Sequence, residues 1–401
     1  MKFKVPHLVF LVVILWGRLP LTQSSAQGSI EVVGQTATYL FNNWIHFTVH
    51  VQSSLGLQEG FVFYQFAGNE QTWVYEGEWG EEQTLEIQVP LDSENQPTPF
   101  TELEYWFRFA SDLGEIFESQ HYTLYYDDNR YAWQTLENAP FTLYWYSGDE
   151  AFARSVLAAA QQGISRSKQF FPPVDPQTVI LRVYDNAEDV QLISQQAGFT
   201  WSAGHVDPQV GMILLSLPPG PQQSLEVQRQ VPHEIAHLML YETLAASYYR
   251  LPYWFNEGLA SNIEIYSDPA RAELLDSAYT REDLIPFFSL CKTFPQDSAS
   301  ARLAYAQSSS FVRYLFEKYK VAGFALLMDA YAQNDDCVNA SVADFGKDLI
   351  TLEAEWRQAT FSSAEGFYGW WTTNPMQTIV ISVAVALALY FFFRLVRSRA
   401  K

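Results

Sequence analysis

The spacing of apolar residues changes near residue 135, and this change divides the chain into two kinds of structure. From about 30 to 130, apolar and polar residues alternate, as in WIHFTVHVQ at 44–52, and turn residues separate such runs at short intervals. Alternation with a period of two, without helical stretches between the runs, is typical of antiparallel strands. The pattern predicts an all-β sandwich of the immunoglobulin or fibronectin-III type over residues 27–135.

Strands and helices are mixed after residue 135. Apolar runs predict strands at 141–146, 178–184 and 211–217, the last with a free edge. Helical spacing predicts helices at 149–170, 186–197 and 224–249, then at 256–266, 300–319, 321–332 and 341–359. We therefore expect an α+β multidomain protein whose second domain, 136–365, joins a small mixed sheet to a helical lobe.

The first 26 residues have the pattern of an export signal. Lys2 and Lys4 form a basic start, Leu8–Trp16 is apolar, and Ser24-Ser25-Ala26 offers small residues for cleavage. The apolar run is too short to cross a bilayer, although an uncleaved anchor is the alternative.

A second apolar segment, Met376–Phe393, carries no charge. At ~1.5 Å per residue it would span roughly 27 Å, close to the hydrocarbon thickness of a membrane. The tail 394–401 is basic, and positive charge stays on the cytoplasmic side. The segment predicts a single transmembrane helix with a cytoplasmic C-terminus and all preceding domains outside; a buried core helix is the alternative.

The net charge of the chain excludes nucleic acid as a partner, and its two cysteines suit an oxidising compartment. A formal net charge of −21 leaves no basic surface for nucleic acid. Cys291 and Cys337 both lie in the part expected to be exported, where a disulfide can form. Such a bond would stabilise the fold by roughly 4 kcal/mol through chain entropy. Two unpaired buried thiols are the alternative.

The stretch VPHEIAHLML at 231–240 suggests a metal site, because it places two of the seven histidines four residues apart. On a helix, residues i and i+4 share one face, so His233 and His237 can bind one ion. Glu234 is turned away from the first histidine by about 100° and can reach a water on that ion. The spacing predicts a zinc hydrolase, with Glu234 as general base. An amphipathic helix carrying these residues by chance is the alternative.

The third ligand is expected to be acidic, because no histidine follows His237. The acidic residues that follow nearby are Glu242, Glu257, Glu264 and Asp268. Pro252 breaks the chain and Asn256 can cap a new helix, which would bring Glu257 back to the histidines. Glu264, two turns beyond Glu257 on the same face, is a candidate to orient a ligand. An ordinary first-turn glutamate is the alternative for Glu257.

These motifs resemble a known group of enzymes. The HEIAH stretch, followed by Asn256-Glu257-Gly258, resembles the gluzincin metallopeptidases. WFNEGLA at 254–260 is similar to the same segment in the aminopeptidase branch and in the peptidase MA-like family. Similarity to the latter covers roughly 140–360. It implies a zincin-type catalytic domain with His233, His237 and Glu257 as zinc ligands and Glu234 as catalytic base.

Two further expectations follow from the resemblance. It implies Tyr305 as the residue that stabilises the oxyanion; the alternative is a core aromatic. Aminopeptidases of this kind carry Gly-x-Met-Glu-Asn before the zinc motif, whereas this chain has GMILLSL, which lacks an acid. We therefore do not expect aminopeptidase activity.

The sequence as a whole predicts a membrane-anchored, extracytoplasmic zinc metallopeptidase. It would hold one Zn²⁺ per chain and hydrolyse peptide or protein substrates by a metal-activated water. Two other functions stay open: a zinc-containing but non-catalytic cell-surface binding or adhesion protein, and a structural surface protein without metal.

Overall fold

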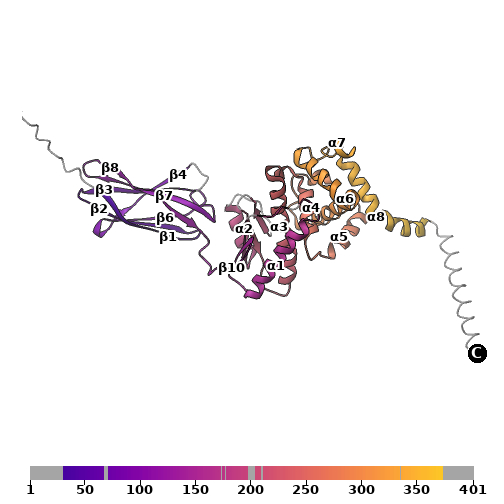
Figure 1. The fold of residues 1–401 in the computed structure, drawn as a ribbon, viewed down its shortest axis with the longest axis horizontal. Helices are drawn as coiled ribbons and strands as arrows, with labels where there is room; N and C mark the ends of the chain where they lie inside the picture. The colour runs from indigo at the N-terminus through magenta and orange to yellow at the C-terminus, as the bar shows by residue number, and fades with distance from the viewer. Residues whose placement is uncertain are drawn as a thin grey trace, which may run out of the picture. The chain divides into compact units, whose positions relative to one another are not determined.

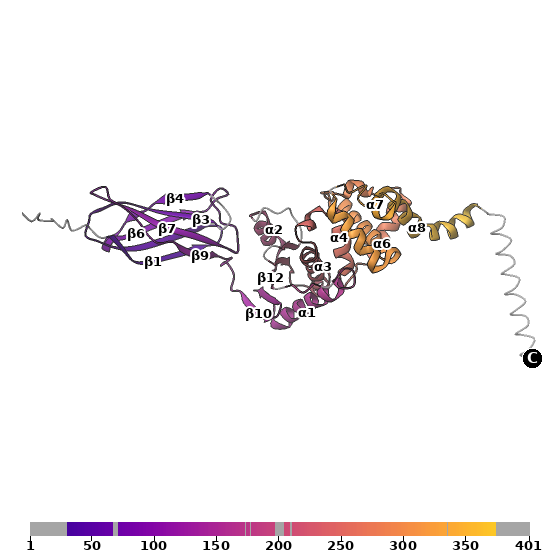
Figure 2. The same cartoon turned by 45° about the horizontal axis from the view of Figure 1, so that its top comes forward.

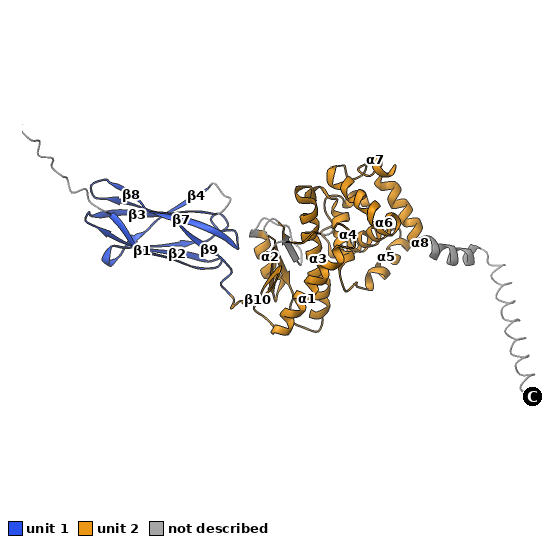
Figure 3. Cartoon of the chain, viewed as in Figure 1, with its two compact units in different colours: residues 1–130 blue, residues 131–401 orange. Residues whose placement is uncertain are grey.

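The computed structural model describes residues 30–66, 71–172, 174–176, 178–196, 204–208, 211–334 and 336–373. The chain forms two compact units, Met1–Arg130 and Tyr131–Lys401, coloured separately in Figure 3. The predicted signal 1–26, the predicted membrane helix 376–393 and the tail 394–401 lie outside the described residues. Within the described ranges, no helix combines the length and the apolar character that a membrane span requires.

The first unit consists of two antiparallel sheets, most of whose strands are labelled in Figures 1 and 2. One sheet has the order β1 (Ile30–Leu40), β2 (Trp44–Ser53), β6 (Thr84–Pro90) and β5 (Glu78–Trp79). The other has the order β4 (Thr72–Glu76), β3 (Leu57–Phe66), β7 (Thr101–Ser111) and β8 (Ile116–Glu118), and β9 (Tyr122–Tyr126) also pairs with β7. The prediction of an all-β N-terminal region is therefore confirmed.

Alternation along the strands builds the core of this unit. On β2, Ile45, Phe47 and Val49 are fully buried, whereas His46 and Thr48, which lie between them, are not. Apolar residues of β3 and β7 complete the same cluster from the second sheet. Because successive side chains of a strand point to opposite faces, this register buries one face of each sheet against the other.

The second unit contains a five-stranded mixed sheet. Its order is β10 (Gln134–Asn138), β11 (Phe141–Trp145), β12 (Val179–Tyr184), β14 (Met212–Ser216) and β13 (Gly204–Asp207). The three central strands are parallel and the outer two pair antiparallel. The β14 sequence MILLS is buried throughout, as expected for a strand covered on both faces. Because β10 pairs with β11, the division between the units falls slightly before the expected residue 135.

The expectation of a free edge on 211–217 is wrong. β14 has β12 on one side and β13 on the other, so β13 is the last strand in the order. The physical reason is a hairpin: the short segment 204–207 pairs antiparallel with 212–215 of β14 and covers its edge. His205, which the sequence placed before the edge strand, lies on β13 itself.

Two long helices pack on each other beside the sheet. α1 (Glu150–Ser167) begins at Asp149, whose side chain accepts a hydrogen bond from the Phe152 amide, as an N-cap does. α3 (Gln223–Leu244) crosses α1 where Gly163 meets Ile235 and Pro232; a Cβ at Gly163 would lie 3.0 Å from both. This close contact fixes the helix that carries the histidine pair.

The remaining helices complete the second unit and share one hydrophobic core with the sheet and the two long helices. They are α4 (Tyr253–Ile263), α5 (Ala270–Thr280), α6 (Ser298–Gln333), α7 (Val342–Phe345) and α8 (Leu349–Thr373), while α2 (Ala187–Gln196) lies by the sheet. The two helices predicted at 300–319 and 321–332 are the two arms of α6, which breaks at Lys320 (φ 57°). α5 had not been predicted. A disulfide joins Cys291 to Cys337, with Cα atoms 6.1 Å apart.

Candidate metal centre

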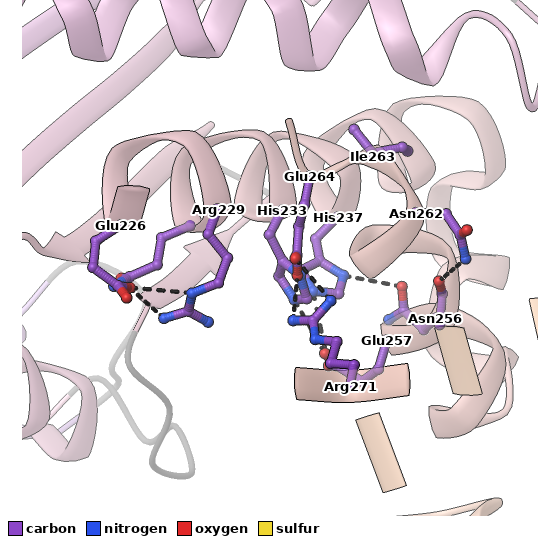
Figure 4. Close-up of polar contacts among 12 residues, drawn as sticks. Glu226, Arg229, His233, His237, Asn256, Glu257, Asn262, Ile263, Glu264 and Arg271 are labelled. Carbon is purple, nitrogen blue, oxygen red and sulfur yellow. Dashed lines mark hydrogen bonds and ion pairs between the residues drawn. The ribbon is translucent and has the colours of Figure 1, made fainter. Parts of the chain in front are cut away.

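Two consecutive helices bring the predicted ligands together. α3 presents His233 and His237 on one face, with ring centroids 5.0 Å apart, and α4 presents Glu257 opposite them. Glu257 lies 3.2 Å from Nε2 of His233 and 3.8 Å from Nε2 of His237. One donor atom from each residue lies within 4.8 Å of the others, and all three side chains are largely buried. Figure 4 shows them converging from the two helices.

The turn between these helices differs from the prediction. α4 begins at Tyr253, directly after Pro252, so Asn256 does not cap the helix but lies inside its first turn. Proline suits this boundary because its fixed φ matches a helix start and it has no N–H to satisfy. Asn256 instead uses its side chain in the site: its Oδ1 accepts a hydrogen bond from Nδ1 of His237 at 3.0 Å.

Each histidine is oriented through its Nδ1 atom. Asn256 accepts the hydrogen bond from His237 and donates another from Nδ2 to the Tyr248 hydroxyl at 3.1 Å. Nδ1 of His233 lies 3.2 Å from Oε1 of Glu264, and Oε2 of Glu264 forms an ion pair with Arg271 at 2.8 Å. Bonds of this kind fix the orientation of a metal-binding imidazole and leave Nε2 for the ion.

Glu264 reaches this position differently from the prediction. The sequence placed it on the same helical face as Glu257, but α4 ends at Ile263 and Glu264 is its extended C-terminal residue (ψ 137°). Arg166 bonds to the backbone oxygens of Ile263 and Glu264, which fixes the chain where it leaves the helix. The Glu264 side chain is 1% exposed and points to His233. Of the other acidic candidates, Glu242 is exposed on α3.

Burial and neighbouring charges shift the acid–base properties of the site. Burial, opposed by His233, raises the pKa of Glu234 to about 7. Burial alone would lower the pKa of His233, but hydrogen bonds to Glu257 and Glu264 raise it to about 10. Burial lowers the pKa of His237. Burial would raise the pKa of Glu257, but the two histidines lower it, so this carboxylate is ionised.

Two tyrosines complete the site. Tyr305, on α6, lies with its ring centroid 6.3 Å from that of His233, and burial together with the charge of Glu257 raises the pKa of its hydroxyl. The charge of Glu257, with burial, also raises the pKa of Tyr253 on α4. Sequence reasoning named Tyr305 but missed Tyr253 and Arg271. The spacing of Tyr253, four residues before Glu257, was the signal available for it, whereas nothing in the sequence pointed to Arg271.

Comparison with known proteins identifies the second unit. The sequence model of the Peptidase MA superfamily matches residues 159–362, just over half of the chain. The chain belongs to the Peptidase MA superfamily. This confirms the resemblance drawn from the HEIAH and WFNEGLA motifs, and the matched range contains the ligand set and both tyrosines. A search of curated proteins finds no match for this Peptidase MA member.

Solved structures resemble the Peptidase MA chain only distantly. An M1 zinc metallopeptidase from Deinococcus radiodurans aligns with 10% identity and a TM-score of 0.33, over 82% of this chain and 94% of that chain. A carbohydrate-binding module family 56 beta-1,3-glucan binding domain aligns with 15% identity and a TM-score of 0.17, over 24% of this chain and 98% of that chain. These scores are too low to support a conclusion about this protein.

Proposed function

We propose that the second unit is a zinc-dependent metallopeptidase in which His233, His237 and Glu257 hold one Zn²⁺. The observation that carries this proposal is the convergence of three donor atoms within 4.8 Å. Two donors on a tetrahedral zinc at ~2.0–2.1 Å lie about 3.4 Å apart. The separations of 3.2 and 3.8 Å from Glu257 to the two imidazoles fit this distance. Two histidines and a glutamate are also a known set of ligands for catalytic zinc.

The remaining residues suit peptide hydrolysis by water. Zinc, when bound, polarises a carbonyl and lowers the pKa of a bound water to ~7. Glu234, whose pKa of about 7 suits proton exchange near neutrality, takes the proton of the attacking water and returns it to the leaving amine. Tyr305 keeps its proton, since burial raises its pKa, and donates a hydrogen bond to the carbonyl oxygen as negative charge develops there.

The substrate is proposed to be an extended peptide rather than a free N-terminus. β14, which precedes the zinc helix, has the sequence MILLS and offers no acid to hold a substrate amine. β13 is the last strand in the sheet order, and a strand in that position can pair with an extended chain. We propose an endopeptidase or a peptidase of broad specificity.

The test separates catalysis from metal binding. Full-length protein and a Glu234→Gln variant are incubated with a peptide library, with and without a chelator, and zinc content is measured. We expect the wild type to cleave and the variant to keep its zinc yet lose at least ~10²-fold in rate. Glu242→Gln, on the exposed face of the same helix, is the matched control. Zinc binding without cleavage in the wild type would favour the binding or adhesion protein.

We also propose that the protein is anchored in a membrane by 376–393, with both units on the extracytoplasmic side. The Cys291–Cys337 disulfide supports this side, because such bonds persist in oxidising compartments. Labelling intact cells with a membrane-impermeant reagent tests the topology. Modification of the two units, with protection of a tag on the C-terminus until the membrane is opened, is the expected result; the reverse pattern would refute it.

A further inference from the structure

A cavity of about 260 Å³ lies where α1, α4 and α6 meet. It is slightly smaller than the ~300–1,000 Å³ of sites for drug-sized ligands, so it suits a small molecule. The lining residues that bear on its chemistry are Arg166, Phe170, Asn262, Arg313, Phe316 and Glu317. None of them is a proposed zinc ligand, so the cavity is a candidate for a second binding site.

Arg166 is fixed in the cavity wall by neutral acceptors. Its Nε donates to the backbone oxygen of Ile263 at 2.6 Å, and its Nη2 donates to those of Asn262 and Glu264 at 3.2 and 2.8 Å. These oxygens belong to the end of α4, where a helix leaves carbonyls unpaired. Among the described residues, Nη1 of Arg166 has no partner.

Arg313 is fixed by a buried amide. Its Nε donates to Oδ1 of Asn262 at 3.0 Å. Asn262 is 4% exposed, and its Nδ2 donates to the backbone oxygens of Gly258 and Ser309 at 2.7 and 2.8 Å. The amide therefore cannot turn without losing three hydrogen bonds. Neither terminal nitrogen of Arg313 has a partner in the part of the chain that the structure describes.

The lining carries an excess of positive charge. Within the described ranges, neither Arg166 nor Arg313 forms an ion pair, and this includes Glu317. Two positive charges and one negative charge leave an excess of one, because the other lining residues are neutral. The chain has a net charge of −21, so carboxylates that could pair with these arginines are abundant. Two guanidinium groups held rigidly in one cavity without a carboxylate are prepared for an anion from outside the chain.

A second part of the lining is apolar. The rings of Phe170 and Phe316 pack with centroids 4.4 Å apart and planes tilted by 38°. Both side chains are half-buried and line the same cavity as the arginines. A ligand that uses both parts of the lining therefore has an apolar group beside its negative charge. Inorganic phosphate lacks the apolar group and carries more charge than the lining leaves unbalanced.

We propose that this cavity binds a carboxylate attached to a small apolar group. The carboxylate accepts hydrogen bonds from Nη1 of Arg166 and the terminal nitrogens of Arg313, and the apolar group packs on Phe170 and Phe316. A free organic acid and the C-terminal residue of a peptide both have this chemistry. The site is separate from the proposed metal centre and does not depend on zinc.

Phenylacetate is the probe, and its binding to full-length protein is measured by ligand-observed NMR. A ligand of about ten heavy atoms should bind with a dissociation constant of about 0.1–10 mM. Phenylacetamide keeps the ring without the charge, and acetate keeps the charge without the ring. We expect both to bind at least about tenfold more weakly, because each loses one of the two kinds of contact. N-acetylphenylalanine, which imitates the end of a peptide, distinguishes the two sources of the carboxylate.

Three variants locate the site. Arg313→Gln should weaken phenylacetate binding by about tenfold or more, the usual cost of losing charge-assisted hydrogen bonds. Arg302→Gln is the matched control, because it removes the same charge from an exposed position earlier on α6, and it should leave the affinity unchanged. Glu317→Gln removes the negative charge from the lining and should strengthen binding by about threefold. A gain of this kind cannot result from loss of structure.

The outcomes separate this inference from the proposed function. Phenylacetate should bind equally well with and without a chelator, whether or not the wild type cleaves peptides. Binding that a chelator abolishes would place the acid on the metal and overturn the inference. No binding at about 10 mM, equal binding by a folded Arg313→Gln protein, or binding of phosphate without phenylacetate would also overturn it. Melting temperatures show whether each variant is folded.

Discussion

Gly258 follows the proposed zinc ligand Glu257 and allows α4 to approach α6 closely. A Cβ added there would lie 2.5 Å from the backbone oxygen of Ser308 and 2.7 Å from a methyl group of Val312. Ordinary contact begins at 3.4 Å, so α4 would have to move by about 0.9 Å from the Ser308 carbonyl. The obstacle is backbone, which no side-chain rotation can relieve. We therefore predict that Gly258→Ala disturbs the metal centre more than its small size suggests.

The magnitude follows from two opposing effects. Alanine in a helix is favoured over glycine by about 1 kcal/mol, whereas overpacking a core costs about 1–3 kcal/mol. A clash with backbone belongs at the upper end, so the net loss in the free energy of unfolding should be about 1–2 kcal/mol. In a domain of this size that lowers the melting temperature by about 2–8 °C. Metal sites tolerate only about 0.2 Å in ligand distance, so zinc affinity should fall at least ~10-fold.

The assay measures thermal unfolding and zinc competition on the same full-length protein. Gly34→Ala is the matched control, because its added Cβ would meet its nearest neighbour, in His50, at 3.7 Å. That substitution lies in the first unit and should leave zinc affinity unchanged. A Gly258→Ala protein with the zinc affinity and melting temperature of the wild type would refute the claim that the α4–α6 contact positions Glu257.

Four other results are expected. Replacing Cys291 and Cys337 by serine should cost roughly 4 kcal/mol in the free energy of unfolding, measured with denaturant; a loss below about 1 kcal/mol would contradict it. Glu264→Gln should weaken zinc binding by about 10-fold or more in the competition assay, and an unchanged affinity would contradict a role for its bond to His233. Lys318 and Lys347 lower the pKa of Glu355 against the effect of burial. Ionised Glu355 therefore stabilises the fold at pH values above its pKa in the unfolded chain. This stabilisation is lost as the pH falls through the pKa of Glu355 in the folded chain. Glu355→Gln should flatten the acid side of a stability–pH curve by up to about 1 kcal/mol, and an unchanged curve would refute this. Finally, zinc affinity should rise with pH below about 10, where His233 must lose a proton to bind the ion; a flat titration would contradict this.

The parts of the structure that sequence could predict are those set by local spacing. Alternation along 44–52 fixed which face of β2 is buried, because a strand has a period of two. The spacing of His233 and His237 placed both on one helical face for the same kind of reason. Glu257 required one more step, a turn that returns α4 to α3, and Pro252 signalled that turn. The alternative roles of the other nearby acidic residues could be weighed but not resolved by spacing.

The parts that sequence could not predict depend on contacts between distant segments. Arg271 forms its ion pair with Glu264 only because α5 follows α4 back past the site, and α5 itself has no strong apolar period. The free edge was assigned to the wrong strand because β13 is short and its pairing with β14 leaves no mark on the sequence. Asn256 was assigned to a helix cap, a common local role for asparagine, although its bond to His237 decides its position.

The charges around His233 balance one another within the folded chain. Both ring nitrogens of His233 face carboxylates at 3.2 Å, one from Glu257 and one from Glu264. An imidazole that donates from both nitrogens is protonated, in agreement with its raised pKa of about 10. The proton thus supplies part of the positive charge that zinc would bring, and it limits repulsion between two buried carboxylates. The positive charge of Arg271 already balances the negative charge of Glu264. Replacing the His233 proton with zinc would therefore change the charge balance mainly at Glu257.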